Sequence, residues 1–132
     1  MTLNLESNII MSGKVLLVDD SPQTRNSIKD ALKGLFSNFI EADDGLGAIK
    51  VFVEEKPGFI ITDVEMPKID GFTLTQRLRN NESYRETPII IVTSREKDED
   101  KKRGIAVGAN AYIVKGAFDQ SNLLDTIQNL VG

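Results

Sequence analysis

The most constraining feature of this sequence is a set of short apolar runs that do not alternate with polar residues. Three of them, 15–18, 59–62 and 89–92, are apolar nearly throughout. A strand with one solvent-exposed face alternates apolar and polar residues. A continuous apolar run is instead typical of a strand that is buried on both faces, as in a parallel sheet. Two further runs, 38–42 and 111–114, complete a set of five expected strands.

Longer segments between these runs have helical spacing. Ser21 and Pro22 suit the N-cap and the first position of a helix. The apolar residues of this first helix are expected on one face, and they are Ile28, Ala31, Leu32, Leu35 and Phe36. Asp44 is the expected cap of a second helix. Five strand–helix repeats predict an α/β fold, a doubly wound five-stranded parallel sheet with helices on both faces.

Three more helices complete the repeats. They are expected over about 71–80, over about 96–107, and in the last segment, which carries Leu123 and Ile127 on one face. The helix at 96–107 is almost wholly charged until Ile105. We therefore expect it to be poorly buried.

The length of the chain and the composition of its N-terminal segment limit the number of domains that it can form. Residues 1–13 are polar and irregular, and we expect them to form a flexible N-terminal extension ahead of one domain at 14–132. A chain of 132 residues is too short for two ordinary domains. No apolar run approaches the roughly 20 residues that span a bilayer, and nothing resembles a signal peptide. The expected location is the cytoplasm, without membrane contact.

Composition narrows the chemistry. The chain has no cysteine and no histidine, which excludes disulfides, zinc fingers, thiol catalysis and Ser-His-Asp sites. Any metal site must use oxygen ligands, which suits a hard cation. The net charge is −4, and the basic cluster 101–103 directly follows the acidic cluster 98–100, so no nucleic-acid partner is expected.

Polar side chains follow four of the five expected strands. Asp19 and Asp20 come after the first strand, Asp63 after the third, Thr93 ends the fourth and Lys115 follows the fifth. In an open parallel sheet, the functional crevice lies beyond the carboxyl ends of the strands. Three clustered carboxylates repel one another unless a cation neutralises them. Mg²⁺ fits best, because it keeps several waters and needs only a few carboxylates and a phosphate.

Each of these residues also has an ordinary structural interpretation. An acidic pair after a strand is often a polar turn, Lys115 a surface lysine, Thr93 a β-branched strand residue and Tyr112 core packing. Convergence at one edge favours a site instead. A carboxylate such as Asp63 can attack a phosphoryl group and form an acyl phosphate, while an ammonium such as Lys115 pairs with phosphoryl oxygen as a point charge.

Four motifs in order resemble those of response-regulator receiver domains. They are Val15-Leu-Leu-Val-Asp-Asp-Ser21, Asp63-Val-Glu-Met-Pro-Lys-Ile-Asp-Gly71, Ile91-Val-Thr-Ser94 and Gly108-Ala-Asn-Ala-Tyr-Ile-Val-Lys115. The resemblance covers 14–132 and implies the strand order 2-1-3-4-5. The ending at 115–120 looks most like receivers fused to chemotaxis-type hybrid kinases, or their single-domain relatives.

The resemblance implies a phosphorylation site. Asp63 would be the phosphoacceptor, supplied by a phosphohistidine on a partner histidine kinase or phosphotransfer protein. Asp20 would bind Mg²⁺ directly and Asp19 mostly through water. Asp63 and the backbone carbonyl of Glu65 would complete the protein ligands. The chain would catalyse only its own phosphorylation and dephosphorylation.

The resemblance also implies a switch. Lys115 would pair with the phosphoryl group, Thr93 would move toward it, and Tyr112 would turn inward to follow. This movement would alter the face formed by helix 96–107, strand 111–114 and the last helix, where a downstream protein is expected to dock. The chain ends directly after the last helix, so we expect output through protein contact. Such a shift requires about 5 kcal/mol of differential stabilisation, and the weakly packed helix at 96–107 is the element expected to yield.

Two departures from the family pattern concern the site. Gly116 follows Lys115 where the family usually has proline, often after a cis bond, so we expect this loop to be trans or more mobile. Position 94 is serine where alanine is frequent. Glu65 and Arg95 occupy positions that tune the access of hydrolytic water in this family, and a salt bridge between them would lie over the phosphoryl group.

Three alternatives stay open at this point. A phosphatase with an aspartyl-phosphate intermediate needs a second acid two residues beyond the nucleophile, which Glu65 could mimic. A flavodoxin-like cofactor binder predicts a phosphate loop rich in Ser, Thr and Gly after the first strand, where Asp19 and Asp20 stand. A receiver could also act unphosphorylated, as a scaffold.

Overall fold

The sheet is five-stranded, parallel and ordered β2-β1-β3-β4-β5. The computed structural model describes residues 11–115 and 120–131. The strands are β1 Met11–Val18, β2 Phe36–Ala42, β3 Phe59–Thr62, β4 Ile89–Thr93 and β5 Ala111–Val114. The predicted parallel sheet and its strand order are confirmed.

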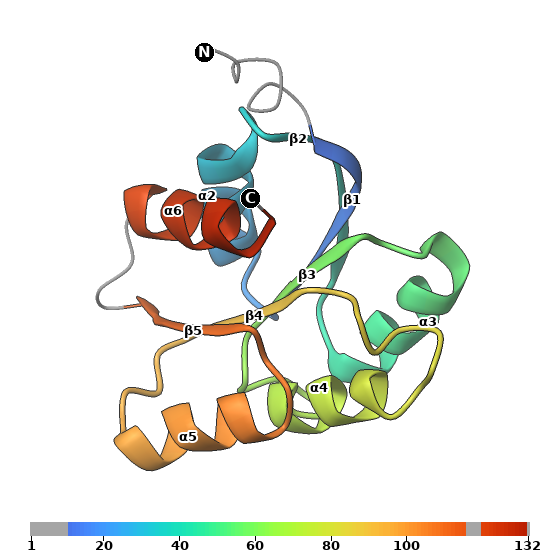
Figure 1. Ribbon diagram of the computed structural model, residues 1–132, viewed down its shortest axis with the longest axis vertical. Helices are drawn as coiled ribbons and strands as arrows, with labels where there is room; N and C mark the ends of the chain where they lie inside the picture. The colour runs from blue at the N-terminus through green and yellow to red at the C-terminus, as the bar shows by residue number, and fades with distance from the viewer. Residues whose placement is uncertain (1–10, 116–119, 132) are drawn as a thin grey trace.

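Helices cover both faces of this sheet, as predicted. Their bounds are α2 Pro22–Leu32, α3 Gly45–Glu55, α4 Gly71–Arg79, α5 Asp98–Ala106 and α6 Gln120–Val131. Figure 1 shows α2 and α6 on one face, and α3, α4 and α5 on the other. The fold is therefore a doubly wound α/β sandwich.

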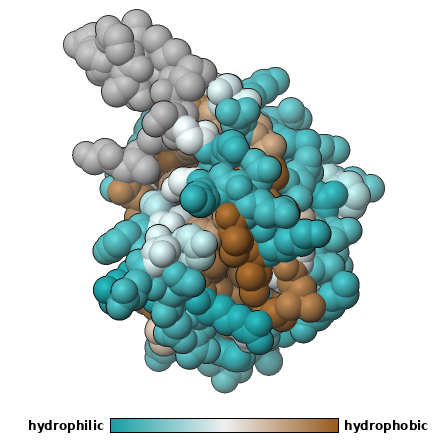
Figure 2. All heavy atoms as spheres, turned by 90° about the vertical axis from the view of Figure 1, so that its right-hand side faces the viewer, coloured by the Kyte–Doolittle hydropathy of each residue, from teal (hydrophilic) through white to brown (hydrophobic). Residues whose placement is uncertain are grey.

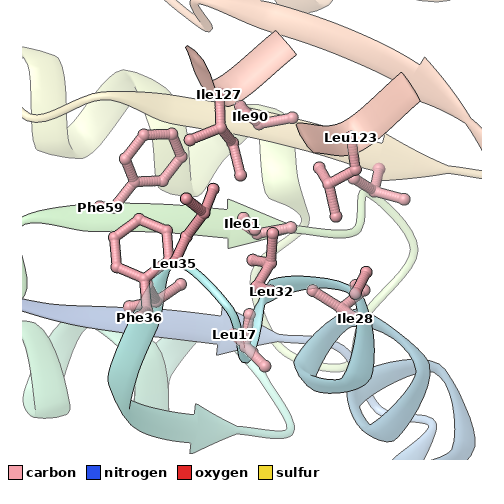
Figure 3. Close-up of a cluster of buried hydrophobic side chains, with 13 residues drawn as sticks. Leu17, Ile28, Leu32, Leu35, Phe36, Phe59, Ile61, Ile90, Leu123 and Ile127 are labelled. Atoms are coloured by element: carbon pink, nitrogen blue, oxygen red, sulfur yellow. The ribbon is translucent and has the colours of Figure 1, made fainter. Parts of the chain in front are cut away.

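Successive residues of the central strands enter opposite layers of the core, which explains why these runs are apolar throughout. In β1, Val15 and Leu17 face α2 and α6, whereas Leu16 and Val18 face α3 and α4. Figure 3 shows the core between the sheet, α2 and α6. Its buried members are Val15, Leu17, Ile28, Ala31, Leu32, Leu35, Phe36, Phe59, Ile61, Ile90, Val92, Leu123 and Ile127.

Both predicted helix caps are present. The Ser21 hydroxyl accepts a hydrogen bond from the Thr24 N–H at 3.3 Å, and Pro22 opens α2. The Asp44 carboxylate accepts one from the Gly47 N–H at 2.7 Å. Each cap satisfies a backbone donor that the first helical turn leaves without a partner. Both helices therefore start immediately after the loops that follow β1 and β2.

The end of α2 was predicted too late. The helix ends at Leu32, and Phe36 is the first residue of β2 rather than part of the helix. Gly34 disfavours continuation of the helix. Leu35 and Phe36 are nevertheless buried in the same core as the helix, so their helical spacing reflected burial but not helical structure.

The first strand begins before the expected domain boundary. Met11–Gly13, assigned to the flexible extension, form the start of β1, and Met11 pairs with Phe36. The register shifts between Met11 and Lys14, where Gly13 has a φ of +94°. A bulge with a positive φ favours glycine, and it disguises the strand in the sequence. Residues 1–10 of the predicted extension lie outside the described residues.

Helix α3 leaves two large apolar side chains in solvent, and Ile105 of α5 is also exposed. Leu46 and Val53 of α3 are 49% and 51% exposed, and the face of the molecule on which α3 lies shows an apolar strip between hydrophilic areas (Figure 2). None of the helices within residues 11–115 and 120–131 combines the length and apolarity that crossing a membrane would require.

Candidate functional site

Three carboxylates meet at the carboxyl edge of the sheet. Ligand oxygens of Asp19, Asp20 and Asp63 all lie within 4.8 Å of one another. Asp19 and Asp63 are only 3% and 7% exposed, whereas Asp20 is exposed. The predicted convergence of these acids, which leave β1 and β3, is therefore present.

Backbone donors fix one oxygen of each buried carboxylate. The Ser21 N–H donates to Asp19 Oδ1 at 2.8 Å, and the Val64 N–H donates to Asp63 Oδ1 at 2.7 Å. The second oxygen of each residue, Oδ2, instead accepts a hydrogen bond from Lys115. The carboxylates are thus oriented before any ligand binds.

Lys115 is the cation shared by the two buried acids. Its Nζ lies 3.0 Å from Asp19 Oδ2 and 3.1 Å from Asp63 Oδ2. Burial acts to lower the pKa of Lys115, but the hydrogen bonds and charges of both carboxylates outweigh it and raise this pKa above its usual value. The ammonium is therefore held in its charged form beside Asp63.

The site keeps an excess of negative charge. Burial raises the pKa of the Asp19 carboxyl, even though Ser21 and Lys115 stabilise its ionised form. One ammonium among three carboxylates leaves the cluster under-neutralised. The donors are all oxygens, so the arrangement fits a hard divalent cation such as Mg²⁺. The Glu65 backbone carbonyl stays a predicted ligand.

The two predicted switch hydroxyls both bind the backbone of Arg95. Thr93 is fully buried at the end of β4, and its hydroxyl oxygen lies 3.4 Å from the Arg95 N–H. The Tyr112 hydroxyl donates to the Arg95 carbonyl at 2.9 Å. Among the described residues, no hydrogen bond joins either hydroxyl to Asp63 or Lys115. Both hydroxyls therefore contact the loop that follows β4.

A guanidinium links this loop to the residues around it. Arg95 NH2 lies 3.8 Å from Glu65 Oε2, in agreement with the pair predicted across the site. Its NH1 lies 3.4 Å from Asp100 Oδ1, in the first turn of α5. Gly116 lies outside the described residues. The trans or more mobile loop expected after Lys115 therefore stays a prediction.

Sequence reasoning missed two residues that support the site. Arg25 of α2 donates through NH1 to the Asp19 carbonyl, and its Nε pairs with Glu41 of β2 at 2.7 Å. Asp100 was interpreted only as part of a charged helical surface. Arg25 carried a usable signal, because it lies one turn beyond the Ser21 cap and thus near the loop that holds Asp19.

Comparisons with known proteins agree with this geometry. The chain matches the family model of the response regulator receiver domain over residues 15–128. The gliding motility regulatory protein of Myxococcus xanthus is 41% identical over 117 residues, which are 89% of this chain and 15% of that protein. The sensor histidine kinase CheAY of Helicobacter pylori is 37% identical over 103 residues, which are 76% of this chain and 13% of that protein.

The chain therefore spans only a small part of either of these two relatives. The solved structure of the chemotaxis response regulator CheY4 of Vibrio cholerae is similar with a TM-score of 0.80 and 34% identity, over 91% of this chain and 99% of that chain. The chain belongs to the response regulator receiver domain family of two-component systems, and its relatives include chemotaxis proteins.

Proposed function

We propose that Asp63 accepts a phosphoryl group from a phosphohistidine on a histidine kinase or phosphotransfer protein, and that the chain then signals by protein contact. The observation that carries this proposal is the shared contact of Lys115 with Asp19 and Asp63 inside an under-neutralised cluster of acids. Proteins of this family generally signal rather than catalyse.

The orientation of Asp63 suits a nucleophile. Its Oδ1 is held by the Val64 N–H, which leaves Oδ2 to attack. As the bond from Oδ2 to phosphorus forms, the bond from phosphorus to the histidine nitrogen breaks, and the imidazole keeps the electron pair. Lys115 already touches Oδ2, so it can follow the charge onto a phosphoryl oxygen.

Asp19, Asp20 and Asp63 would hold Mg²⁺, with the Glu65 carbonyl as a further ligand. When bound, this ion neutralises the acids and the oxygens of the transferred group. The chain's own contribution is to present the carboxylates in one place, because their strands end at the same edge of the sheet. Chelation of Mg²⁺ is therefore expected to abolish transfer.

A dianionic phosphoryl group would accept a hydrogen bond from the Thr93 hydroxyl, whose oxygen makes only a long contact with the Arg95 N–H. Thr93 would then shift toward the site and Tyr112 would turn inward. Through Arg95, which both hydroxyls contact, the change would reach the face formed by α5, β5 and α6. This face is the proposed docking surface for the downstream protein.

The experiment uses purified protein with Mg²⁺ and acetyl phosphate, read by intact mass. We expect one phosphoryl adduct on the wild type, no adduct on Asp63→Asn, and none after addition of a chelator. Asp43→Asn is the matched control, because Asp43 is an exposed acid that follows β2 outside the cluster. An adduct that persists on Asp63→Asn contradicts the proposal.

The same protein tests the enzyme alternative. A phosphatase with an aspartyl-phosphate intermediate would hydrolyse many equivalents of a phosphate ester, whereas the proposed receiver is limited to its own acyl phosphate. We expect no multiple turnover on aryl phosphate. The absence of membrane, nucleic-acid and flavin partners and the cytoplasmic location stay predictions from the sequence.

A further inference from the structure

The Arg95 side chain lies between the proposed phosphorylation site and α5. Its NH2 is 3.8 Å from Glu65, in the loop after β3, and its NH1 is 3.4 Å from Asp100, in the first turn of α5. Charge-assisted hydrogen bonds usually measure about 2.7–2.9 Å. The guanidinium thus lies between two carboxylates, and its distance to each is longer than that of a normal charge-assisted hydrogen bond.

The remaining nitrogen of this guanidinium is not satisfied. Arg95 Nε is buried and has no hydrogen-bond partner among the described residues. A buried donor without a partner is unfavourable, so the Arg95 position is not the optimum for its own hydrogen bonding. The ion pairs that the guanidinium does make among the described residues are those with Glu65 and Asp100, so removal of either carboxylate should let the guanidinium move.

The backbone of Arg95 is better anchored than its side chain. Its carbonyl accepts a hydrogen bond from the Tyr112 hydroxyl at 2.9 Å, and its N–H faces the Thr93 hydroxyl. Burial raises the pKa of the Tyr112 phenol, the charges of Asp100 and Asp63 add to this rise, and Arg95 opposes it. The Tyr112 phenol therefore responds both to the charge of Asp63 in the site and to the charge of Asp100 in α5.

We propose that Asp100 is a positioning residue that draws the Arg95 guanidinium away from Asp63 and thereby shortens the lifetime of the acyl phosphate. The inference rests on the proposed function of Asp63. A phosphoryl dianion on Asp63 adds a third anion that attracts the guanidinium from the side of Glu65. Asp100 opposes this attraction, so the phosphorus stays open to water.

The step that Asp100 influences is hydrolysis. A water oxygen bonds to phosphorus while the bond from phosphorus to the Asp63 oxygen breaks. The carboxylate keeps that electron pair, and the proton of the water leaves with inorganic phosphate or to solvent. Without Asp100, the guanidinium closes over Glu65 and the phosphoryl group and obstructs the approach of water.

The test compares acyl phosphate lifetimes. Wild type and variants are loaded with acetyl phosphate and Mg²⁺, the donor is removed, and intact mass follows the decay. We expect Asp100→Asn to lengthen the half-life about twofold to fivefold, which is the rate equivalent of a weak, partly exposed ion pair. Asp98→Asn is the matched control, because it removes an exposed charge from the same helical turn. Its half-life should equal that of the wild type.

Two further variants distinguish positioning from a general effect on α5. In an Arg95→Gln background, Asp100→Asn should have no effect, whereas Asp100→Glu alone should restore the wild-type half-life. In the unphosphorylated protein, the NMR resonance of Arg95 Nε–H should shift in Asp100→Asn and stay in place in Asp98→Asn. A stability effect on the helix would not produce this combination.

The outcomes are distinct. An unchanged or shorter half-life in Asp100→Asn overturns the inference, as does an effect that persists without Arg95 or appears equally in Asp98→Asn. These results leave the proposed function intact, because loading itself still depends on Asp63. If the wild type takes up no phosphoryl group, the proposed function fails, and the inference on lifetime fails with it.

Discussion

Two helices on the same face of the sheet, α4 and α5, have equal length but very different attachment. Each spans nine residues. Helix α4 buries Gly71, Phe72, Leu74, Thr75 and Leu78, whereas α5 buries Gly104 alone. The Asp70 carboxylate caps α4 by accepting the Thr73 N–H at 2.8 Å, whereas the Lys97 side chain makes no capping hydrogen bond in α5.

The difference shows which helix can respond to a charge placed on Asp63. The start of α4 lies directly against the backbone of Asp63 and Val64, and the Gly71 N–H donates to the Val64 carbonyl at 2.9 Å. Helix α5 instead makes contacts that involve side chains. Asp100 pairs with Arg95, Gly104 packs against the Tyr112 ring, and the Arg103 guanidinium lies 4.5 Å from the centroid of the Phe72 ring. We expect α4 to hold the site and α5 to move.

The largest expected effect comes from adding one methyl group to the start of α4. A Cβ at Gly71 would lie 2.1 Å from the Asp63 carbonyl oxygen, which is backbone and cannot move aside. Gly71→Ala should lower the free energy of unfolding by about 2–3 kcal/mol, the cost of overpacking, and should also impair loading of Asp63. Urea unfolding followed by circular dichroism measures the first effect.

The counterpart in α5 is Gly104→Ala. Its Cβ would lie 2.7 Å from a ring carbon of Tyr112, a side chain that is only partly buried and can shift. The gain in helix propensity of about 1 kcal/mol offsets that repacking, so the net change should stay within about 1 kcal/mol. Equal destabilisation by the two substitutions would break the comparison.

The cap of α4 gives the next largest effect. Asp70→Ala removes the acceptor of the Thr73 N–H and should cost about 1 kcal/mol of stability. Asp70→Asn keeps an acceptor and should cost much less. Native-state hydrogen exchange should show the loss in the first turn of α4 and not in α5. Similar losses in both variants would mean that Asp70 acts by its charge.

A smaller effect of opposite sign is expected at the start of α5. Lys97 has extended dihedrals that suit an N-cap, but its side chain cannot accept a hydrogen bond. Lys97→Ser supplies an acceptor and should stabilise the protein by about 0.5 kcal/mol, with slower hydrogen exchange in α5. Lys97→Ala removes the lysine without an acceptor and should not stabilise. A gain in both variants would point to charge.

Much of this difference could be predicted from the sequence. The central strands and the acidic cluster were predictable, because burial on both faces leaves runs such as 89–92 unbroken, and parallel strands end at one edge. The weak burial of α5 followed from its charged residues. Local patterns thus predicted the architecture and the convergence of the three acids.

Other features depend on contacts that local patterns do not encode. The spacing of Leu35 and Phe36 fitted a helix, yet both reach the core from beyond its end. The start of β1 was hidden by the bulge at Gly13. The pairing of Arg95 with Asp100 required the distance between a loop and a helical turn, which spacing along the chain does not give.

The smallest expected effect uses pH to test the contact between β5 and α5. Burial, joined by the charge of Asp100, raises the pKa of the Tyr112 phenol above 10.0. The folded protein then binds this proton more tightly than the unfolded chain. The resulting stabilisation is complete below the unfolded pKa and is lost as pH rises through the folded one.

Urea unfolding of wild type and Tyr112→Phe, from about pH 9 to about pH 11, isolates this group because the variant keeps every other titratable side chain. The stability of the wild type relative to the variant should fall over that range. Ionised Tyr112 lies against Gly104, so the methyl resonance of Ile105 on α5 should shift in the wild type, while that of Leu74 on α4 should not. A constant stability difference would contradict the raised pKa of Tyr112, and equal shifts of both methyl groups would contradict the contrast between α5 and α4.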